Sequence, residues 1–305
     1  MYVFTGTILS LSVIIISILY QLNFFSKPQH DNRAWLTLLA SEDYMPGVQA
    51  LARSLKRVKT KYPLVVMMEK NMFSNDIQRL ILNEGCSVVF IQDLQSNQKI
   101  DFIFARFHHV WKKLRAFELV DTCSKCVFMD ADILVLQNMD ELFDLHENVT
   151  FAAVQTCICN PSRNPKYPSH WNPPNCPYTH EHISFKAIDL EITEYSIFNS
   201  GLFFFRSSLS LFDQMTEALN SWNLTEFRFP DQDFLNRFFD QKWTRISVIY
   251  NALKTYSKTH PHLWDTSKIK AIHYILSKPW DQSDNGNLEY EDINKLWWEI
   301  YNHSS

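Results

Sequence analysis

Two aspartates that directly follow an apolar run are the residues of this chain best suited to do chemistry. Asp130 and Asp132 flank Ala131 and come after residues 127–129, a short apolar segment typical of a buried strand. Two carboxylates one residue apart at a strand end suit a divalent cation that prefers oxygen ligands, Mg²⁺ or Mn²⁺, and substrate phosphates commonly complete such a site. The pair therefore indicates metal-assisted handling of a diphosphate.

A DxD motif by itself leaves other interpretations open. One is a strand that ends in solvated acids, and another is a phosphohydrolase of the haloacid dehalogenase type, in which the first aspartate is a nucleophile. The phosphohydrolase also needs a distant acidic motif with a glycine before an aspartate, and none of the five glycines of this chain precedes one. The same scarcity of glycine argues against a GxGxxG dinucleotide loop and a P-loop.

Six segments in a fixed order narrow the choice. They are AWLTLLASEDYMPGVQALARSLK, WKKLRAFEL, FMDADILVLQNMDELFD, FNSGLFFFRSS, FPDQDFLNRFF and HYILSKPW. In content and order they resemble glycosyltransferase family 8, the group that includes glycogenin and the galactinol synthases. The resemblance covers residues 34–280, and the cysteine-containing insertion at 155–180 is most similar to fungal members of the family.

The resemblance implies an α/β fold of the GT-A type, a Rossmann-like nucleotide-diphospho-sugar domain with a mostly parallel central sheet. It also implies sugar transfer with retention of the anomeric configuration. The hydrophobic pattern supports this architecture independently, because short apolar runs alternate with helical patterns at 46–57 and 110–120. The apolar runs are residues 35–39, 64–68, 88–91 and 127–129. Ligands of such sheets bind beyond the strand carboxyl ends, where the DxD motif lies.

The family resemblance also assigns residues to a UDP-sugar donor. Leu38 and Tyr44 are expected at the uracil and ribose, where an aromatic face is physically suitable, although Leu38 is equally compatible with a simple core position. Lys113 corresponds to a donor-contacting lysine. Arg106 is the nearest candidate for an arginine on the phosphate side.

The resemblance makes Asp130, Asp132 and His273 the protein ligands of the metal. His273 lies in the apolar segment 271–275, which predicts a short strand. An imidazole beside two carboxylates favours Mn²⁺ over Mg²⁺. Lys278 is expected to neutralise charge on the leaving diphosphate, as phosphate-binding lysines do.

Five further residues are expected near the transferred sugar: Asn199, Ser200, Gly201, Asp231 and Gln232. Glycine lets the backbone approach the sugar closely, and the amide side chain can bind hydroxyl groups. Asp231 and Gln232 are the predicted catalytic residues, because an oxygen atom near the anomeric centre stabilises an oxocarbenium-like state. Asp233 is interpreted instead as a residue that stabilises the start of a helix.

The first 25 residues carry no charged side chain and are long enough to span a bilayer. No basic region precedes the apolar stretch and no small-residue cleavage site follows it, which favours a signal anchor over a cleaved signal peptide. We therefore expect a transmembrane anchor at 1–25, a short stem at 26–33 and a catalytic domain at 34–305. Glycosylation sequons at Asn148, Asn223 and Asn302 are consistent with a lumenal catalytic domain of a single-pass type II protein in the Golgi or endoplasmic reticulum membrane.

Cys157, Cys159 and Cys176 lie in the insertion and have two interpretations. Histidines in the same part of the chain would add zinc ligands: His170, His180 and His182. The spacing matches no standard zinc finger, and in a lumenal protein a disulfide of Cys176 with Cys157 or Cys159 is favoured. Cys123 and Cys126 form a CxxC pair without an evident redox role, and the family resemblance implies that Cys126 is a packing residue.

The amino-acid composition limits the classes of molecule that this protein is expected to bind. A net charge of −4 without a basic block argues against nucleic acid, and 46% hydrophobic residues can form the core of one domain. The acceptor stays open among a glycan, a lipid and a protein, including the chain's own Tyr256, which follows an Ile-Tyr-Asn segment. A catalytically inactive family member that acts as a membrane-anchored scaffold is the alternative function.

Overall fold

The computed structural model describes residues 32–98, 105–161, 163–179, 196–281 and 285–303. The described elements belong to the compact unit Arg33–Ser305. The expected anchor at 1–25 lies outside the described residues. Within the described ranges, no helix has both the length and the apolar character needed to cross a membrane.

A seven-stranded sheet forms the centre of this unit, with the strand order β3-β2-β1-β4-β7-β6-β8. Its strands are β1 (Arg33–Leu39), β2 (Leu64–Glu69), β3 (Ser87–Ile91), β4 (Lys125–Met129), β6 (Phe151–Gln155), β7 (Phe198–Arg206) and β8 (Thr244–Ile246). Of these described strands, β7 runs against the others. The four strands predicted from apolar runs are confirmed, and so is the mostly parallel sheet.

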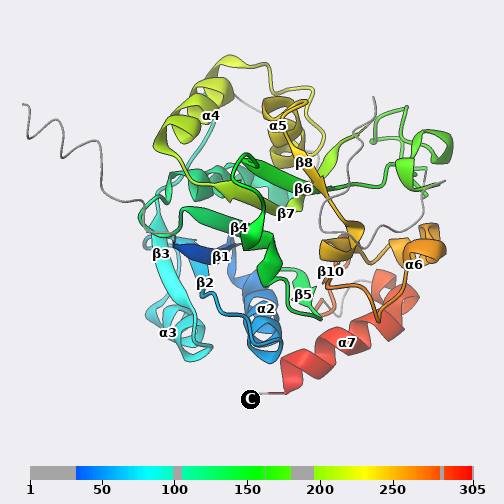
Figure 1. The fold of residues 1–305 in the computed structure, drawn as a ribbon, viewed down its shortest axis with the longest axis horizontal. Coiled ribbons are helices and arrows are strands. Elements are labelled where there is room, and N and C mark those ends of the chain that lie inside the picture. The colour runs from blue at the N-terminus through cyan, green and yellow to red at the C-terminus, as the bar shows by residue number, and fades with distance from the viewer. Residues whose placement is uncertain (1–31, 99–104, 162, 180–195, 282–284, 304–305) are drawn as a thin grey trace, which may run out of the picture. The chain divides into compact units, whose positions relative to one another are not determined.

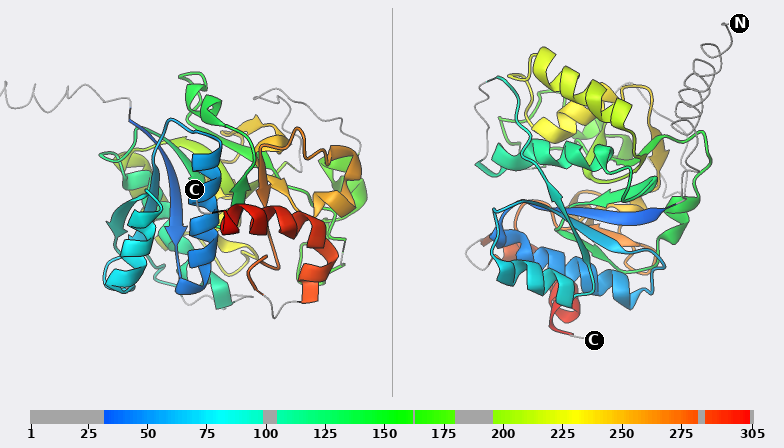
Figure 2. Two further views of the ribbon diagram at one scale, coloured as in Figure 1. Left: turned by 90° about the horizontal axis from the view of Figure 1, so that it is seen from below. Right: turned by 90° about the vertical axis from the view of Figure 1, so that its left-hand side faces the viewer.

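Helices cover both faces of this sheet (Figures 1 and 2), with α4 and α5 on one face and α2 and α3 on the other. The α-helices are α2 (Met45–Arg57), α3 (Asn75–Asn83), α4 (Leu209–Ser221), α5 (Pro230–Phe238), α6 (Tyr256–Thr259) and α7 (Glu291–Asn302). The 3₁₀ segments are η1 (Glu42–Tyr44), η2 (Ala105–Glu118), η3 (Asp140–Asp144), η4 (Pro173–Asn175), η5 (Pro177–Thr179), η6 (Val248–Tyr250), η7 (Pro261–Leu263) and η8 (Asn285–Tyr290). The predicted helical segment at 110–120 thus lies largely in η2.

Side chains alternate between two hydrophobic cores along each strand. In β1, Trp35 and Leu39 pack with α2 in one core, whereas Leu36 packs with residues of α4 and α5 in the other. Because both faces are covered, an interior strand needs no polar face. This explains the uninterrupted phenylalanines 203–205 of β7, all of which are buried.

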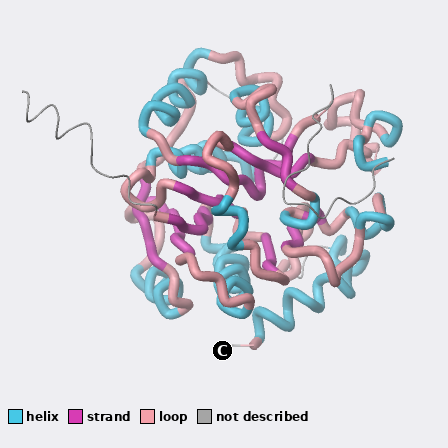
Figure 3. Tube along the Cα trace, in the orientation of Figure 1, coloured by secondary structure: helices cyan, strands magenta, loops and turns pink. Residues whose placement is uncertain are grey.

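A second, three-stranded sheet lies beside the first and appears as short magenta segments in Figure 3. Its order is β5-β10-β9, formed by β5 (Ile133–Val135), β10 (Ala271–His273) and β9 (Ala252–Leu253). The predicted strand at 271–275 is present but ends at His273. Since β5 directly follows the DxD motif, this sheet brings distant parts of the chain to the carboxyl end of β4.

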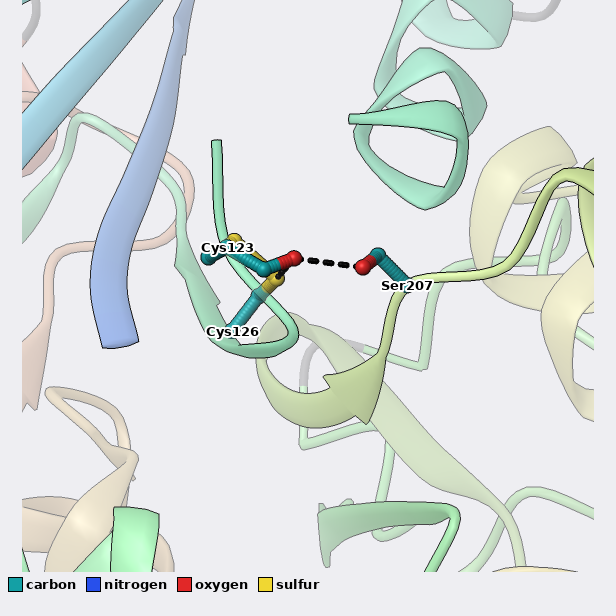
Figure 4. The surroundings of a disulfide bond; sticks show 3 residues. All are labelled: Cys123, Cys126 and Ser207. Atoms are coloured by element: carbon teal, nitrogen blue, oxygen red, sulfur yellow. Dashed lines mark hydrogen bonds between the residues drawn. A yellow bond between two sulfur atoms is a disulfide. The ribbon is translucent and has the colours of Figure 1, made fainter. Parts of the chain in front are cut away.

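Cys123 and Cys126 are joined by a disulfide (Figure 4). Both residues are buried, and Ser207 donates a hydrogen bond to the carbonyl oxygen of Cys123. The interpretation of Cys126 as a simple packing residue is therefore wrong. The bond closes the turn that leads into β4, so it anchors the strand that carries the DxD motif.

The expected disulfide within the insertion is not formed, because Cys157, Cys159 and Cys176 are free thiols. Each of them lies next to His260, a residue more than 80 positions away from any of the three. The sequence interpretation paired these cysteines with nearby histidines, of which His180 and His182 lie outside the described residues. Local spacing did not reveal His260, because it arrives through the tertiary fold.

Candidate active site

The DxD motif forms a tight turn at the carboxyl end of β4. The backbone N–H of Asp130 donates to the carbonyl oxygen of Gly201 at 2.7 Å, and Ile133 closes the turn by donating to the carbonyl of Asp130 at 3.1 Å. The side chain of Asp132 is buried, whereas that of Asp130 is 30% exposed. One carboxylate is thus held inside the protein, and the other reaches toward solvent, where a ligand can approach.

Strand register places His273 beside this turn. In the antiparallel pair of β10 and β5, His273 lies opposite Ile133, and the N–H of Tyr274 donates to the carbonyl of Asp132 at 2.9 Å. As a result, His273 Nε2 is 3.1 Å from Asp132 Oδ1 and 4.0 Å from Asp130 Oδ2. The three predicted metal ligands therefore converge, with their ligand atoms within 4.8 Å of one another.

The orientation of His273 fits a bound cation. His273 Nδ1 is 3.0 Å from Asn251 Oδ1, an amide oxygen that can only accept, so Nδ1 carries a proton. This contact directs Nε2 toward Asp132 Oδ1, which lies 3.1 Å away. Two carboxylates and one imidazole suit Mn²⁺ in particular.

Lys113 connects the DxD turn to helix α5. Its Nζ is 2.9 Å from Asp130 Oδ1, 2.6 Å from Asp231 Oδ2 and 3.3 Å from the carbonyl oxygen of Ser200. Burial alone would lower the pKa of Lys113, but the carboxylates of Asp130 and Asp231 raise it above its usual range. The neighbouring Lys112 points elsewhere, because it pairs with Glu69. Lys113 is therefore a fixed positive charge between two site carboxylates.

An amide network links α5 to the metal ligands. Gln232 Oε1 accepts from Asn199 Nδ2 at 3.0 Å and from the N–H of Ser200 at 3.4 Å. Asn199 Oδ1 in turn accepts from Asn251 Nδ2 at 2.9 Å, and Asn251 contacts His273 as described above. Because each amide is oriented by its neighbours, the first turn of α5 and the histidine are held in one connected arrangement.

Helix α5 is positioned by the side chain of Asn236, which bonds both backbone polar groups of Phe198 in β7. Asn236 Oδ1 accepts from the N–H of Phe198 at 2.8 Å, and its Nδ2 donates to the carbonyl of the same residue at 2.9 Å. This clamp holds α5 against the start of β7. Asp231 and Gln232, in the first turn of α5, are consequently placed over the Asn-Ser-Gly segment, and Ser200 Oγ donates to Asp231 Oδ2 at 2.9 Å.

Asp233 has the structural role expected from the sequence. Its Oδ2 accepts from the N–H groups of Arg228 and Phe229, at 2.6 and 2.9 Å, just before α5 begins. Burial raises the pKa of Asp233 to about 6, although these two hydrogen bonds act in the opposite direction. The carboxylate thus stabilises the chain that enters α5.

Two glycines are required by close packing at the site. A Cβ on Gly201 would clash with the imidazole of His273 and with Asn199, and a Cβ on Gly47 would clash with the carbonyl of Ala131. Gly201 was expected to give space to a sugar, whereas in the structure the space beside it is filled by His273. Gly47 brings the start of α2 against the DxD turn, a contact that the sequence did not predict.

Lys278 and Tyr44 lie on the other side of the DxD turn. Lys278 Nζ forms an ion pair with Asp132 and lies 5.8 Å from the centroid of the Tyr44 ring. Burial would raise the pKa of Asp132, but the charge of Lys278 holds it well below its usual range. Tyr44 also makes an edge contact with Trp280, whose indole N–H donates to the carbonyl of Asp43 at 2.9 Å. The lysine and the aromatic side chain expected at the donor are therefore neighbours.

The remaining predicted residues are less informative. Leu38, at the carboxyl end of β1, is partly buried and packs against one of the two cores, so its place agrees with both interpretations. Arg106 lies in η2, but its side chain is outside the described part of the chain. Ala131 is buried between the two aspartates and contributes its backbone to the turn.

Sequence reasoning missed two buried polar residues, Asn251 and Lys254. Asn251 orients His273, and Lys254 Nζ donates to the carbonyl and hydroxyl oxygens of Ser277 at 2.5 and 2.7 Å, next to Lys278. The Ile-Tyr-Asn segment at 249–251 is the signal available for Asn251 in the sequence, and it also precedes the candidate self-acceptor tyrosine. That tyrosine, Tyr256, is 1% exposed and packs against Tyr178 and His260, so it is inaccessible in this fold.

Comparison with solved structures identifies the class of the fold. WbbM, a bifunctional glycosyltransferase, matches 92% of this chain and 51% of its own length, with 18% identity and a TM-score of 0.62. GlyE of Streptococcus pneumoniae matches with a TM-score of 0.59 and 17% identity, over 90% of this chain and 61% of its own. The galactosyltransferase LgtC matches with a TM-score of 0.54 and 15% identity, over 86% of this chain and 95% of its own. The chain spans only about half to three fifths of the first two proteins. The shared architecture is the GT-A glycosyltransferase fold.

Sequence comparison then identifies the family. The profile described as Glycosyl transferase family 8 matches residues 35–284. Galactinol synthase 1 of Arabidopsis thaliana is 32% identical over 287 residues, which cover 91% of this chain and 81% of the relative. Galactinol synthase 2 of Solanum lycopersicum is 33% identical over 284 residues, with 90% and 81% covered. The chain belongs to glycosyl transferase family 8 and is a glycosyltransferase that uses a nucleotide-sugar donor.

Proposed function

We propose that this glycosyltransferase transfers a hexose-type sugar from a UDP-sugar and uses a divalent cation, Mn²⁺ or Mg²⁺, held by Asp130, Asp132 and His273. Family membership supports the transfer of a sugar from a nucleotide donor. The observation that supports the cation is the convergence of the two carboxylates and the imidazole, whose ligand atoms lie within 4.8 Å of one another. When bound, the cation would supply positive charge to the diphosphate as it leaves.

The lysines of the site have distinct roles in this proposal. Lys278 is now paired with Asp132, and it would exchange part of this contact for a phosphate oxygen of the leaving UDP. Lys113 stays between Asp130 and Asp231 and keeps the two carboxylates from repelling each other. The aromatic ring of Tyr44, beside Lys278, would pack against the nucleoside part of the donor.

Asp231 and Gln232 would act on the sugar itself. Both lie in the first turn of α5, and hydrogen bonds from Ser200 and Asn199 fix the direction of their oxygen atoms. Oxygen atoms that are oriented before the reaction stabilise positive charge at the anomeric carbon at little reorganisation cost. We propose that this arrangement supports transfer with retention of configuration.

The sugar and the acceptor are less constrained. The two relatives compared above are galactinol synthases, and one structural neighbour is a galactosyltransferase, so UDP-galactose is the first donor to test, before UDP-glucose, UDP-glucuronate and UDP-N-acetylglucosamine. The acceptor is proposed to be a glycan, a lipid or another protein. Tyr256 of the same chain is buried, which argues against self-glycosylation at that position.

The direct test is donor hydrolysis by the full chain. The purified protein is treated with EDTA, supplied with Mn²⁺ or Mg²⁺, and incubated with each UDP-sugar while UDP release and the melting temperature are measured. We expect one donor to raise the melting temperature, because it binds only the native state, and to be hydrolysed only after metal is restored. Product anomers observed by NMR then test retention. Failure of every donor with either metal would instead support the scaffold alternative.

We also propose that residues 1–25 anchor the protein in the Golgi or endoplasmic reticulum membrane, with the catalytic domain in the lumen. The absence of charge in this segment supports an anchor. The Cys123–Cys126 disulfide supports an oxidising compartment, and the sequon residues Asn148, Asn223 and Asn302 are all exposed. Resistance to carbonate extraction and a mobility shift with endoglycosidase are expected, and the shift should shrink when the three asparagines are changed to glutamine. Extraction by carbonate would contradict the anchor.

A further inference from the structure

A second cluster of metal-binding side chains lies outside the candidate active site. It consists of Cys157, Cys159, Cys176 and His260, whose ligand atoms all lie within 4.8 Å of one another. The first three come from the insertion after β6, and His260 follows α6, between β9 and β10. The carboxylates, lysines and amides described above make no hydrogen bond to this cluster among the described residues, so the proposed reaction does not account for it.

The spacing of the four ligand atoms is close to that of a tetrahedral zinc site, although two of the three S–N distances are shorter. Zinc binds sulfur at about 2.3 Å and imidazole nitrogen at about 2.0–2.1 Å, so a tetrahedron has S–S edges of about 3.8 Å and S–N edges of about 3.6 Å. Here the Cys157 and Cys176 sulfur atoms are 3.7 Å apart. His260 Nε2 lies 3.1 Å from Cys157 Sγ, 3.3 Å from Cys159 Sγ and 3.6 Å from Cys176 Sγ. A disulfide would need a separation of about 2.05 Å.

Burial and ligand chemistry point to the same ion. Cys159, Cys176 and His260 are 7%, 2% and 2% exposed, whereas Cys157 is half-buried, so two soft sulfur donors and one nitrogen are shielded from solvent and the third sulfur lies at the edge of the cluster. The N–H of Cys159 lies 3.3 Å from Cys157 Sγ, and a backbone donor at this position stabilises a thiolate. Three thiolates and one imidazole form one of the standard ligand sets of structural zinc.

We propose that Cys157, Cys159, Cys176 and His260 bind one structural Zn²⁺. Binding requires each coordinating cysteine to lose its proton to solvent, and the four bonds leave no open position on the ion. The zinc would join the insertion to the chain after β9 by closing a loop of 84 residues between Cys176 and His260. This proposal does not depend on the proposed sugar transfer.

Such a link would have a consequence for the active site. The segment that carries His260 begins just after Asn251 and Lys254 and leads into β10 with its His273. Binding the insertion to this segment would restrain the part of the chain that directly follows Asn251 and Lys254. Closing a long loop with a metal also removes conformational freedom from the unfolded chain, which adds stability.

The test is the metal content of the full chain, purified in detergent without chelator from cells supplied with zinc. We expect about one zinc per chain, with X-ray absorption showing three sulfur neighbours near 2.3 Å and one nitrogen neighbour near 2.0–2.1 Å. Peptide mapping under non-reducing conditions should recover Cys157, Cys159 and Cys176 as thiols. Both measurements use the unmodified protein, so they stay informative if a variant fails to fold.

Variants locate the ion. Cys176→Ser and His260→Ala should lower the zinc content about tenfold. Two control variants should keep it: Cys86→Ser, which changes another buried thiol, and His262→Ala, which changes a histidine that contacts His260. Asp132→Asn should also keep it, which separates this site from the active-site cation. The proposal is overturned if the wild-type protein holds no zinc, if iron or an oxygen-ligated metal is found instead, if Cys176→Ser retains full zinc, or if two of the three cysteines form a disulfide.

Discussion

The two clusters of potential metal ligands in this protein differ in almost every property. At the DxD turn, two carboxylates and His273 lie at the end of β4, Asp130 is 30% exposed, and Lys113 and Lys278 supply positive charge beside them. At the cysteine cluster, three sulfur atoms and His260 form a closed and largely buried set without a lysine partner among the described residues. The first arrangement can exchange an ion together with a substrate, whereas the second would retain it.

This difference in ligand chemistry indicates which role a metal ion would have at each cluster. Hard oxygen ligands with compensating lysines leave room for a charged phosphate and for an ion that comes and goes. Soft sulfur ligands with no room for a fifth partner favour an ion that holds chain segments together. In these two proposals, one chain uses Mn²⁺ or Mg²⁺ for chemistry and zinc for architecture.

The largest expected effect separates the two clusters through activity. Asp132→Asn removes the buried carboxylate that faces His273, and we expect transfer activity to fall about 100- to 1000-fold, the loss typical when a key electrostatic group is removed. The measurement is the steady-state rate of UDP release with saturating Mn²⁺. Asp76→Asn, at an exposed carboxylate, is the matched control. An Asp132→Asn variant with wild-type activity would remove this residue from the catalytic machinery.

The second effect is a loss of stability at the cysteine cluster, with little change in activity. Cys176→Ser should lower the free energy of unfolding by about 4 kcal/mol, because loss of a bound metal is one of the few changes that costs this much. For a domain of this size the melting temperature should fall by about 10 °C. The residual activity per folded molecule should change much less than in Asp132→Asn. Unchanged melting of Cys176→Ser, with and without a strong chelator, would contradict a structural zinc at this cluster.

A smaller effect tests how the active-site histidine is oriented. Asn251→Ala removes the oxygen that holds the Nδ1 proton of His273, and loss of such a supporting contact typically weakens metal affinity 10- to 100-fold. The expected result is a higher Mn²⁺ concentration for half-maximal activity, with activity recovered at saturating metal. Asn138→Ala, at an amide that bonds the backbone at the carbonyl of Val58, provides the control. Equal Mn²⁺ dependence in the two variants would show that Asn251 does not orient the ligand.

The smallest expected effect is a pH dependence of stability that arises outside both clusters. Burial raises the pKa of Asp233 to about 6 from 3.8, so the fold favours the protonated form. This contribution is fully present below the unfolded-state pKa and is lost as the pH rises through about 6. Asp233→Asn keeps an acceptor oxygen without the charge, so the difference in melting temperature between variant and wild type should grow by a few degrees from pH 4 to pH 7. A constant difference across this range would show that Asp233 ionises normally.

Much of the fold could be predicted from local patterns in the sequence, whereas most residues of the candidate site were assigned through the resemblance to a family. The strands at 64–68 and 127–129 are buried along their whole length, so each is an uninterrupted apolar run. The strand at 35–39 is interrupted only by the buried Thr37, and the edge strand at 88–91 is apolar although it is only partly buried. The DxD motif follows one of these runs, and its position at a strand end was therefore predictable. The choice of Lys113 rather than Lys112 as a site residue depended on the family resemblance. Two adjacent lysines in one segment have no local feature that tells which one enters the site.

The contacts that only the tertiary structure revealed are those between distant segments. His260 reaches three cysteines more than 80 residues away, and Asn251 reaches His273 across the small sheet. Local spacing predicted nearby histidines and a disulfide instead, since sequence proximity was the available guide. The requirement for glycine at position 47 was also missed. A side chain there would clash with the carbonyl of Ala131, and this clash arises only when α2 packs against the DxD turn.

The sequence by itself determined the strands and helices along the chain and the position of the DxD motif at the end of one strand, because hydrophobic periodicity and short motifs are local features. The class of chemistry and the choice of His273, which lies far from the DxD motif in the chain, came from the resemblance to a family. The tertiary structure decided which side chains orient those ligands, where glycine is required and which histidine completes the cysteine cluster. Strand register and helix packing set these contacts, and both arise from the burial of many residues at once, which no single segment of the sequence specifies.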